Sequence, residues 1–509
     1  MPRRRFDVLV ETYESFTRSW CGPKRPLAFG LRSLHAGALP VRIKHGFALF
    51  LGLTLLGVLA VVGMKYLRLG PLAAGPRDAP VVIFVIIDTV RADRTSLCGY
   101  ERPTTPNLEA IVEGGATYAC NSHAPSTWTL PSHASFFTGV GLDQHKSGGG
   151  GGGVRMKTGA VTPLGPELPT LAEEMSARGY QTLLLSGNPV VSGPMGLTRG
   201  FDHVAVGRTF PMMHDHRLAE WLEEKLRVAR LDPRRPLFAF INIADPHSPW
   251  TGIPPGVGFL PRRSRMRADP ERTRYESRAM NEDEAAQYLA HLSDVYDYAI
   301  YRADRSLGLV LEVLGSHGWL DHSYRLVITS DHGEYLGEHG MIEHGRPFFY
   351  EPITQVPFLY YSTDGELPLP ADVPAIAAHA LVRDGGLPER LSPGFAAVFR
   401  NPDPATEQRP PCTAARAALW QGGTRLVADR GRVVRFDLTS DPEETAPVPA
   451  DDDPLAKRLL AHCSALDRAF ASRPISEPER DAALTEQLKA LGYLRDDEPE
   501  LPEATPARR

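Results

Sequence analysis

The sequence predicts an α/β fold, in which a doubly wound sheet carries helices on both faces and a smaller α+β subdomain follows. Short apolar runs rich in valine, isoleucine and leucine indicate strands buried on both faces: residues 80–88, 181–186, 236–245 and 324–331. Helix-like stretches separate these runs, and strands that alternate with helices are typical of a doubly wound sheet. The 509 residues are also more than one hydrophobic core usually holds, so we expect two compact units with appendages.

The helical stretches differ in length. Residues 169–178 form the first, and residues 283–314 form the longest, in which apolar side chains recur at helical spacing: Leu289, Leu292, Val295, Tyr296, Ala299 and Ala303. After about residue 410 the pattern changes. Residues 425–438 predict a hairpin or short antiparallel sheet, and residues 451–494 predict a helical region.

These patterns divide most of the chain into three parts. The main domain should cover residues 80–400, and the C-terminal subdomain should cover residues 401–495. Residues 496–509 are rich in charge and proline, which predicts a disordered tail.

An uncharged apolar segment lies near the N-terminus, from Gly46 to Met64. At about 1.5 Å per residue it comes close to the roughly 30 Å hydrocarbon core of a membrane. A buried core helix and a cleaved signal peptide are the alternatives, but the long leader and the lack of a polar stripe favour a retained anchor. We therefore expect a basic leader over 1–45, a transmembrane helix over 46–65 and a linker over 66–79.

Positive charge predicts the orientation of this anchor. Nine basic residues precede the segment: Arg3, Arg4, Arg5, Arg18, Lys24, Arg25, Arg32, Arg42 and Lys44. Between the segment and Asp78 there are only Lys65, Arg68 and Arg77. We expect a single-pass membrane protein with a cytoplasmic N-terminus and a catalytic domain that is periplasmic or extracellular.

The net charge and the cysteines narrow the classes of protein to which the chain can belong. The formal net charge of -5 gives no sign of the basic surface that nucleic-acid binding requires. The five cysteines match no zinc pattern. They are either scattered thiols or, outside the cytoplasm, include a Cys98–Cys120 or Cys412–Cys463 disulfide.

Polar groups capable of chemistry follow three of the predicted strands. Asp88 ends the first strand, Asp245 and His247 follow the third, and Asp331 and His332 follow the fourth. Because α/β sheets place ligands at the carboxyl ends of their strands, these groups should meet. Thr129 lies at or just before a predicted helix N-terminus, where it is either a helix cap or a hydroxyl directed at an anionic ester.

Several segments resemble the sulfatase-like branch of the alkaline phosphatase superfamily. They share order and spacing with that family over residues 80 to about 362: residues 86–111, TLPSHASFFTG at 129–139, DPHSPW at 245–250, and residues 329–359. Residues 436–445 and 488–494 resemble C-terminal features of bacterial members. The resemblance implies an alkaline-phosphatase-like fold and an ester hydrolase.

The resemblance also implies one divalent metal ion. Its ligands would be Asp88, Thr129, Asp331 and His332. Hard oxygen donors with one imidazole permit Ca²⁺, Mn²⁺, Zn²⁺ or Mg²⁺ and select none of them.

The resemblance assigns further residues to catalysis. Thr129 would be the nucleophile, activated by the metal. His247 and His344 fall where the family binds the ester oxyanion or protonates the leaving group, and His133 stands where sulfatases carry an arginine. Asn188 is a candidate substrate contact. The substrate would be a sulfate or phosphate ester, with glycans and lipids as candidate carriers.

The sequence departs from the sulfatase pattern at the nucleophile itself. Sulfatases need cysteine or serine there, because that residue is converted to formylglycine, and threonine cannot give this aldehyde. Thr89 replaces a second aspartate, residues 186–188 replace a Lys-x-His element, and His344 stands where many members have lysine. Three functions remain open: an ester hydrolase, a phospho-headgroup transferase acting on an envelope glycan or lipid, and a degenerate binding protein.

Overall fold

The structure of the protein is a computed structural model. Apart from a few isolated positions, it describes residues 79–149, 161–207, 217–229, 235–250, 274–345, 348–391, 393–399 and 415–471. Contacts divide the chain between Pro71 and Leu72, and the described residues all belong to the second unit. The predicted leader, transmembrane helix and tail lie outside the described residues, as does the linker before residue 79. No helix within the described ranges is both long and apolar enough to cross a membrane.

The main sheet contains eight strands: β1 (Val81–Ile87), β2 (Thr117–His123), β5 (Gln181–Ser186), β6 (His203–Val206), β7 (Leu237–Ile243), β8 (Tyr324–Thr329), β11 (Gln355–Ser362) and β12 (Asp372–Pro374). Their order is β12-β2-β11-β8-β1-β7-β5-β6. The four strands predicted from apolar runs, β1, β5, β7 and β8, are confirmed and lie side by side in parallel register. The sheet as a whole is mixed, because β11 runs antiparallel to both β8 and β2.

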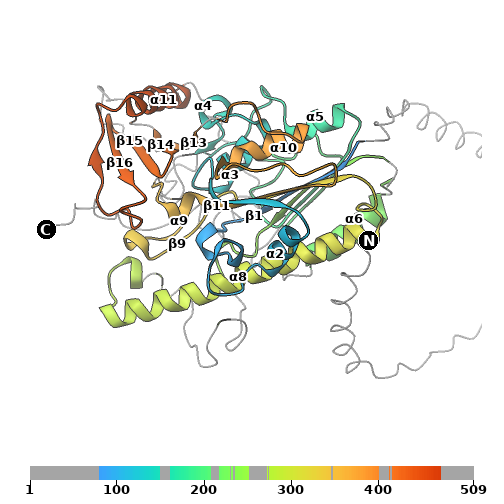
Figure 1. Ribbon diagram of the computed structural model, residues 1–509, viewed down its shortest axis with the longest axis horizontal. Coiled ribbons are helices and arrows are strands. Elements are labelled where there is room, and N and C mark those ends of the chain that lie inside the picture. The colour runs from blue at the N-terminus through green and yellow to red at the C-terminus, as the bar shows by residue number, and fades with distance from the viewer. Residues whose placement is uncertain are drawn as a thin grey trace, which may run out of the picture. The chain divides into compact units, whose positions relative to one another are not determined.

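Helices cover both faces of this sheet, as predicted (Figure 1). Alternate β1 side chains point to opposite faces, which produces two separate cores. Val82, Phe84 and Ile86 pack with helices α3 (Thr129–Thr138), α5 (Leu171–Ala177) and α10 (Ala378–Asp384). Ile83 and Val85 pack with α2 (Pro106–Glu113), α6 (Arg217–Ala229) and α8 (Glu282–Ser316).

The longest predicted helix is α8, and its N-terminus has a clear local cause. Asn281 accepts a hydrogen bond from the Glu284 amide, and Glu284 accepts one from the Asn281 amide. This reciprocal pair satisfies two of the amides that a helix start leaves without partners.

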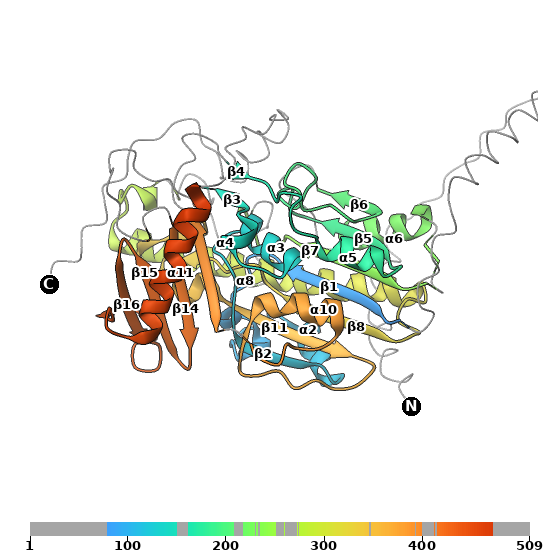
Figure 2. The ribbon, with the colours of Figure 1, turned by 90° about the horizontal axis from the view of Figure 1, so that it is seen from above.

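A second, antiparallel sheet lies beside the first (Figure 2). Its strands, in order, are β13 (Gly394–Phe399), β14 (Ala415–Gln421), β15 (Thr424–Asp429), β16 (Arg432–Asp437) and β17 (Val448–Pro449). Helix α11 (Pro454–Ala471) packs on β14 and β15. The predicted hairpin is therefore β15–β16. The sheet begins at Gly394, which is before the boundary expected at residue 400.

Shorter elements complete the described chain: α4 (Leu142–His145), α9 (Glu351–Thr354), β3 (Gly148–Gly149), β4 (Val161–Thr162), β9 (Tyr335–Leu336) and β10 (Ile342–Glu343). Two disulfides join distant segments, Cys98–Cys120 in the main domain and Cys412–Cys463 in the C-terminal subdomain. Both disulfides were predicted from the sequence as alternatives to free thiols.

Candidate active site

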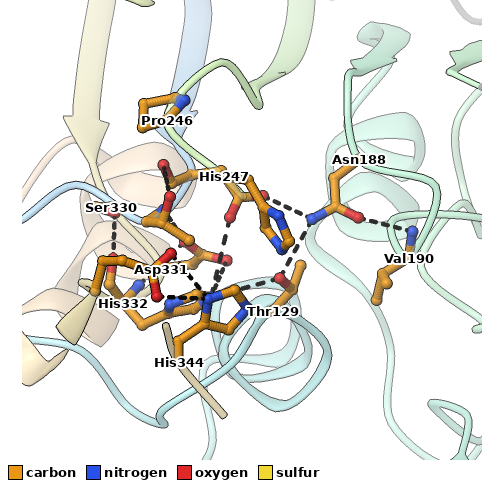
Figure 3. A network of polar contacts seen from close by, with 12 residues as sticks. Thr129, Asn188, Val190, Pro246, His247, Ser330, Asp331, His332 and His344 are labelled. Carbon is orange, nitrogen blue, oxygen red and sulfur yellow. Dashed lines mark hydrogen bonds and ion pairs between the residues drawn. The ribbon is translucent and has the colours of Figure 1, made fainter. Parts of the chain in front are cut away.

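The predicted site residues meet at the carboxyl edge of the main sheet (Figure 3). Asp88 directly follows β1, and Asp331 follows the neighbouring strand β8. His247 follows β7 on the other side of β1. Thr129 begins α3, which comes after β2. Parallel pairing brings these strand ends together, although the residues are far apart in sequence.

Three of the predicted site residues form a candidate metal centre. One ligand atom from each of Asp88, Asp331 and His332 lies within 4.8 Å of the other two, and all three residues are fully buried. Asp88 Oδ1 and Asp331 Oδ2 lack a hydrogen-bond partner among the described residues. Buried carboxylate oxygens without partners are costly unless a cation binds them, so this donor set fits a divalent metal.

Local hydrogen bonds orient His332 for this role. Its Nδ1 lies 2.9 Å from the Gly333 carbonyl oxygen, to which it donates as the neutral tautomer. The other nitrogen, Nε2, faces the carboxylates, 3.4 Å from Asp331 Oδ2 and 3.9 Å from Asp88 Oδ1. Burial lowers the pKa of His332 to about 4, which keeps the lone pair free at neutral pH.

The two carboxylates repel one another in this buried position. Burial, together with the neighbouring Asp88 charge, raises the pKa of Asp331 well above its ordinary value. Two amides oppose this by donating to Asp331 Oδ1, those of Thr89 at 3.1 Å and His332 at 3.0 Å. A bound divalent cation would neutralise both carboxylates at once.

Thr129 faces this centre from the first turn of α3. Its Oγ1 lies 3.5 Å from His332 Nε2 and 3.3 Å from Asn188 Nδ2. The N-cap residue of the helix is Trp128, not Thr129. The hydroxyl therefore lies beside the candidate metal ligands rather than in the capping position.

His133 lies one helical turn behind Thr129. Its Nδ1 is 2.9 Å from the Thr129 carbonyl oxygen and 3.6 Å from Asp331 Oδ2. The rings of Phe136, Phe137 and Phe240 surround it edge to face. Burial lowers its pKa to about 4, so a neutral ring bonds to the first turn of the helix that carries Thr129.

Asn188 bonds to both Thr129 and Asp88. Its side-chain amide donates to Asp88 Oδ2 at 2.8 Å as well as to Thr129 Oγ1. Asn242, on β7, donates to the same Asp88 oxygen at 3.2 Å. Asn242 was not predicted from the sequence, although an asparagine inside an otherwise apolar strand was a signal for it.

Two further histidines, His344 and His247, lie close to the candidate metal ligands. The ring of His344 lies 4.5 Å from that of His332 and 4.6 Å from that of His247, centroid to centroid. His344 Nδ1 is 3.0 Å from Oε1 of Glu334, a fully buried residue that the sequence analysis did not single out. His247 Nδ1 bonds to the Ser248 carbonyl oxygen.

Comparison with known proteins agrees with this arrangement. A family model described as Sulfatase matches residues 80–382. The chain belongs to the sulfatase family. A curated arylsulfatase from Clostridium perfringens is 22% identical over 352 residues, which cover 55% of this chain and 68% of the relative.

Solved structures share the fold of this sulfatase-family chain. A phosphonate monoester hydrolase from Agrobacterium radiobacter aligns with a TM-score of 0.54 at 18% identity, over 78% of this chain and 96% of the other. A phosphonate monoester hydrolase from Silicibacter pomeroyi aligns with a TM-score of 0.52 at 19% identity, over 80% and 97%. As a member of this family, the chain is an ester hydrolase.

The family member departs from the sulfatase pattern at Thr89, and the structure shows how. Thr89 has φ 58°, an unusual value for a β-branched residue. Its hydroxyl donates to the Asp88 carbonyl oxygen at 2.8 Å, and its amide donates to Asp331. Thr89 therefore bonds to the backbone of Asp88 and to the carboxylate of Asp331. Strained backbone of this kind is held in place by its surroundings, most often at functional sites.

Proposed function

We propose that the protein is a membrane-anchored, extracytoplasmic, metal-dependent hydrolase of phosphoric or sulfuric esters that uses Thr129 as a covalent nucleophile. The observation that carries this proposal is the position of the Thr129 hydroxyl, beside both His332 and the amide that holds Asp88. Asp88, Asp331, His332 and Thr129 would hold the metal. When bound, this ion would lower the pKa of the hydroxyl and neutralise charge on the ester oxygens.

The reaction would proceed in two displacements. The Thr129 hydroxyl loses its proton to solvent, and its oxygen forms a bond to phosphorus or sulfur while the bond to the leaving oxygen breaks. His247 or His344 gives the leaving oxygen a proton. Water then attacks the threonine ester and passes a proton to the same histidine. The bond between the Thr129 oxygen and phosphorus or sulfur breaks, and Thr129 regains its proton from solvent. Asn188 holds the attacking oxygen toward Asp88, and neutral His133 supports the helix that carries it.

The nucleophile favours phosphorus over sulfur. Threonine carries a secondary alcohol, and oxidation of a secondary alcohol gives a ketone, not the aldehyde of formylglycine. The hydroxyl itself must therefore attack. We accordingly rank phosphodiesters, phosphate monoesters and phosphonate esters ahead of sulfate esters.

Two features support a location outside the cytoplasm. Disulfides persist mainly in oxidising compartments, and the cysteine pairs 98–120 and 412–463 both lie at bonding distance. The uncharged segment Gly46 to Met64, with its basic leader, supports an anchor whose C-terminal side is exported.

A screen of aryl sulfate, phosphate monoester, phosphodiester and phosphonate substrates, each with Mn²⁺, Zn²⁺, Ca²⁺ and Mg²⁺, tests the proposal. We expect turnover that falls by at least about a thousandfold in Thr129→Ala, with the melting temperature retained. Thr129→Ser keeps a hydroxyl and serves as the matched control. Parental turnover in Thr129→Ala would end the proposal.

Transfer to an acceptor is the second candidate, because a threonine ester can pass its phosphoryl group to an alcohol instead of water. The predicted anchor motivates this alternative, since it would keep the site near lipid donors. Product analysis with a phospholipid donor separates the two. A modified acceptor indicates a transferase, whereas a released headgroup alone indicates a hydrolase.

A further inference from the structure

The loops that carry the site are bonded to one short segment, residues 349–354, which we call the strap. The Gly333 amide donates to the Ile353 carbonyl oxygen at 2.8 Å, and the Glu334 amide donates to that of Pro352 at 3.0 Å. Both amides belong to residues that directly follow Asp331 and His332. The strap therefore fixes the backbone that carries two candidate metal ligands.

The strap also bonds to the chain segment that leads to Thr129. The Ala124 amide, five residues before Thr129, donates to the Thr354 carbonyl oxygen at 2.8 Å. The packing leaves little space for adjustment, since a Cβ atom added at Gly333 would lie 2.1 Å from the Pro352 oxygen. A shift of the strap would move the metal ligands and the nucleophile relative to one another.

The C-terminal sheet holds the strap from the opposite side. On β15, Arg425 donates to the Phe349 carbonyl oxygen and contacts Glu444. Glu444 accepts the Glu351 amide at 2.8 Å. Trp420, on β14, donates its indole N–H to Glu351 Oε1 at 2.7 Å.

Arg425 and Glu444 are deeply buried, with 1% of each side chain exposed. The Arg425 guanidinium also lies 4.4 Å from the ring centroid of Phe436 and 5.3 Å from that of Tyr350. Glu444 has φ 53°, a conformation that non-glycine residues rarely adopt, so the surrounding turn holds it there. Its carboxyl oxygens can accept hydrogen bonds in either protonation state.

Stability alone does not explain such a pair. Buried polar pairs are weak sources of stability, because apolar residues of similar volume often replace them at no cost. The pair instead fixes the position of the strap. Arg425 and Glu444 bond to two backbone groups two residues apart, the Phe349 carbonyl and the Glu351 amide, and so fix where the strap lies.

We infer that Arg425 and Glu444 are positioning residues, through which the C-terminal subdomain sets the geometry between Thr129 and the Asp331–His332 loop. The inference rests on the proposed function. It assigns the subdomain a part in the reaction without a side chain at the reacting atoms.

The test compares the full chain with a double variant, Arg425→Met with Glu444→Leu, which keeps volume and removes the bonds to the strap. We expect a melting temperature within a few degrees of the parent, a Kd for Mn²⁺ at least tenfold weaker, and a kcat at saturating Mn²⁺ at least tenfold lower with KM little changed. Glu444→Gln retains an acceptor for the Glu351 amide and should retain most of the parental kcat.

Two other variants complete the design. Asp451→Ala removes a hydrogen bond to the Val433 amide in the same sheet, away from the strap, and should leave kcat and the Mn²⁺ affinity within twofold of the parent. If the double variant fails to fold, Trp420→Phe removes the indole donor to Glu351 and part of the stacking on His123, and we expect its kcat to fall about threefold.

The outcomes separate the inference from the function on which it rests. A folded double variant with parental kcat and parental Mn²⁺ affinity, or a Trp420→Phe variant with parental kcat, overturns the positioning role alone. A parent protein that neither binds Mn²⁺ nor hydrolyses any ester overturns the proposed function, and the inference fails with it.

Discussion

Asn188 donates a hydrogen bond to the hydroxyl oxygen of Thr129 over 3.3 Å. The same amide nitrogen donates to Asp88 Oδ2 over 2.8 Å. One side chain thus bonds to the candidate nucleophile and to a candidate metal ligand. Asn188 was predicted from the sequence as a candidate substrate contact, and its bonds motivate a second hypothesis, in which it orients Thr129 and Asp88.

Replacing Asn188 by alanine should therefore lower both metal affinity and turnover. Loss of a residue that orients a metal ligand typically costs ten- to a hundredfold in either quantity. Metal titration and steady-state kinetics on Asn188→Ala measure the two effects, with Asn121→Ala, an exposed amide elsewhere on the chain, as the control. A variant that changes KM alone would return Asn188 to a substrate-binding role.

Glu334 should determine how His344 presents its ring to the ester. The carboxyl lies 3.0 Å from His344 Nδ1, which directs Nε2 away from Glu334. Glu334→Ala should lower kcat about ten- to a hundredfold, the range typical for losing an orienting partner. The double variant Glu334→Ala with His344→Ala should be no worse than His344→Ala alone, because the two act through one ring. Additive losses in kcat would contradict this.

Removal of the metal should destabilise the fold as well as stop the reaction. Without a cation, Asp88 and Asp331 lie together in a fully buried site. A ligand present at a hundred times its Kd stabilises the folded state by about 2.7 kcal/mol. Melting curves with EDTA, and again after Mn²⁺ is restored, should show a reversible fall. An equal melting temperature in both conditions would argue against a metal at this site.

Stability should depend on pH through Glu444. Burial raises the pKa of this carboxyl to about 8, with Arg425 opposing the shift, against an ordinary value of 4.5. The folded state holds the proton more tightly than the unfolded state, so this contribution is full below about pH 4.5. This stabilising contribution is lost as the pH rises through about 8. Its size is about 1.4 kcal/mol for each unit by which the pKa of Glu444 in the folded state exceeds that in the unfolded state.

Urea unfolding at pH 5, 7 and 9 measures this dependence. Glu444→Gln cannot titrate, so its free energy of unfolding should fall less between pH 5 and 9 than that of the parent. Parallel pH profiles for the two proteins would show that Glu444 does not titrate in this way.

The predicted anchor implies that the catalytic domain lies outside the cytoplasm, which reporter fusions can test. Reporter domains fused after residue 509 should be active only if they fold on the exported side, and a fusion at residue 40 should show the opposite. Thiol labelling of the denatured full chain should modify Cys21 without reductant and the other four cysteines only after reduction, because these pair as disulfides. A reporter at residue 509 that is active in the cytoplasm would reverse the predicted orientation.

The local pattern of apolar residues was enough to predict the four central strands of the main sheet and its longest helix. Strands β1, β5, β7 and β8 are continuous apolar runs, since they are buried on both faces, and α8 shows its period over many turns. Strands β2 and β11 were missed for physical reasons. β2 carries Asn121, Ser122 and His123 and is only partly buried, and β11 contains Pro357, which weakens a strand prediction.

The sequence by itself determined which residues are candidates for the chemistry, because Asp88, Thr129, Asp331 and His332 stand at strand ends and a helix start that their neighbours specify. It could not determine which side chains support them. Asn242, Glu334 and the pair Arg425–Glu444 find their partners across contacts between segments distant in sequence, and only the tertiary structure brings these segments together. Local sequence encodes strands and helices, whereas the partner of a buried polar group depends on how those elements pack.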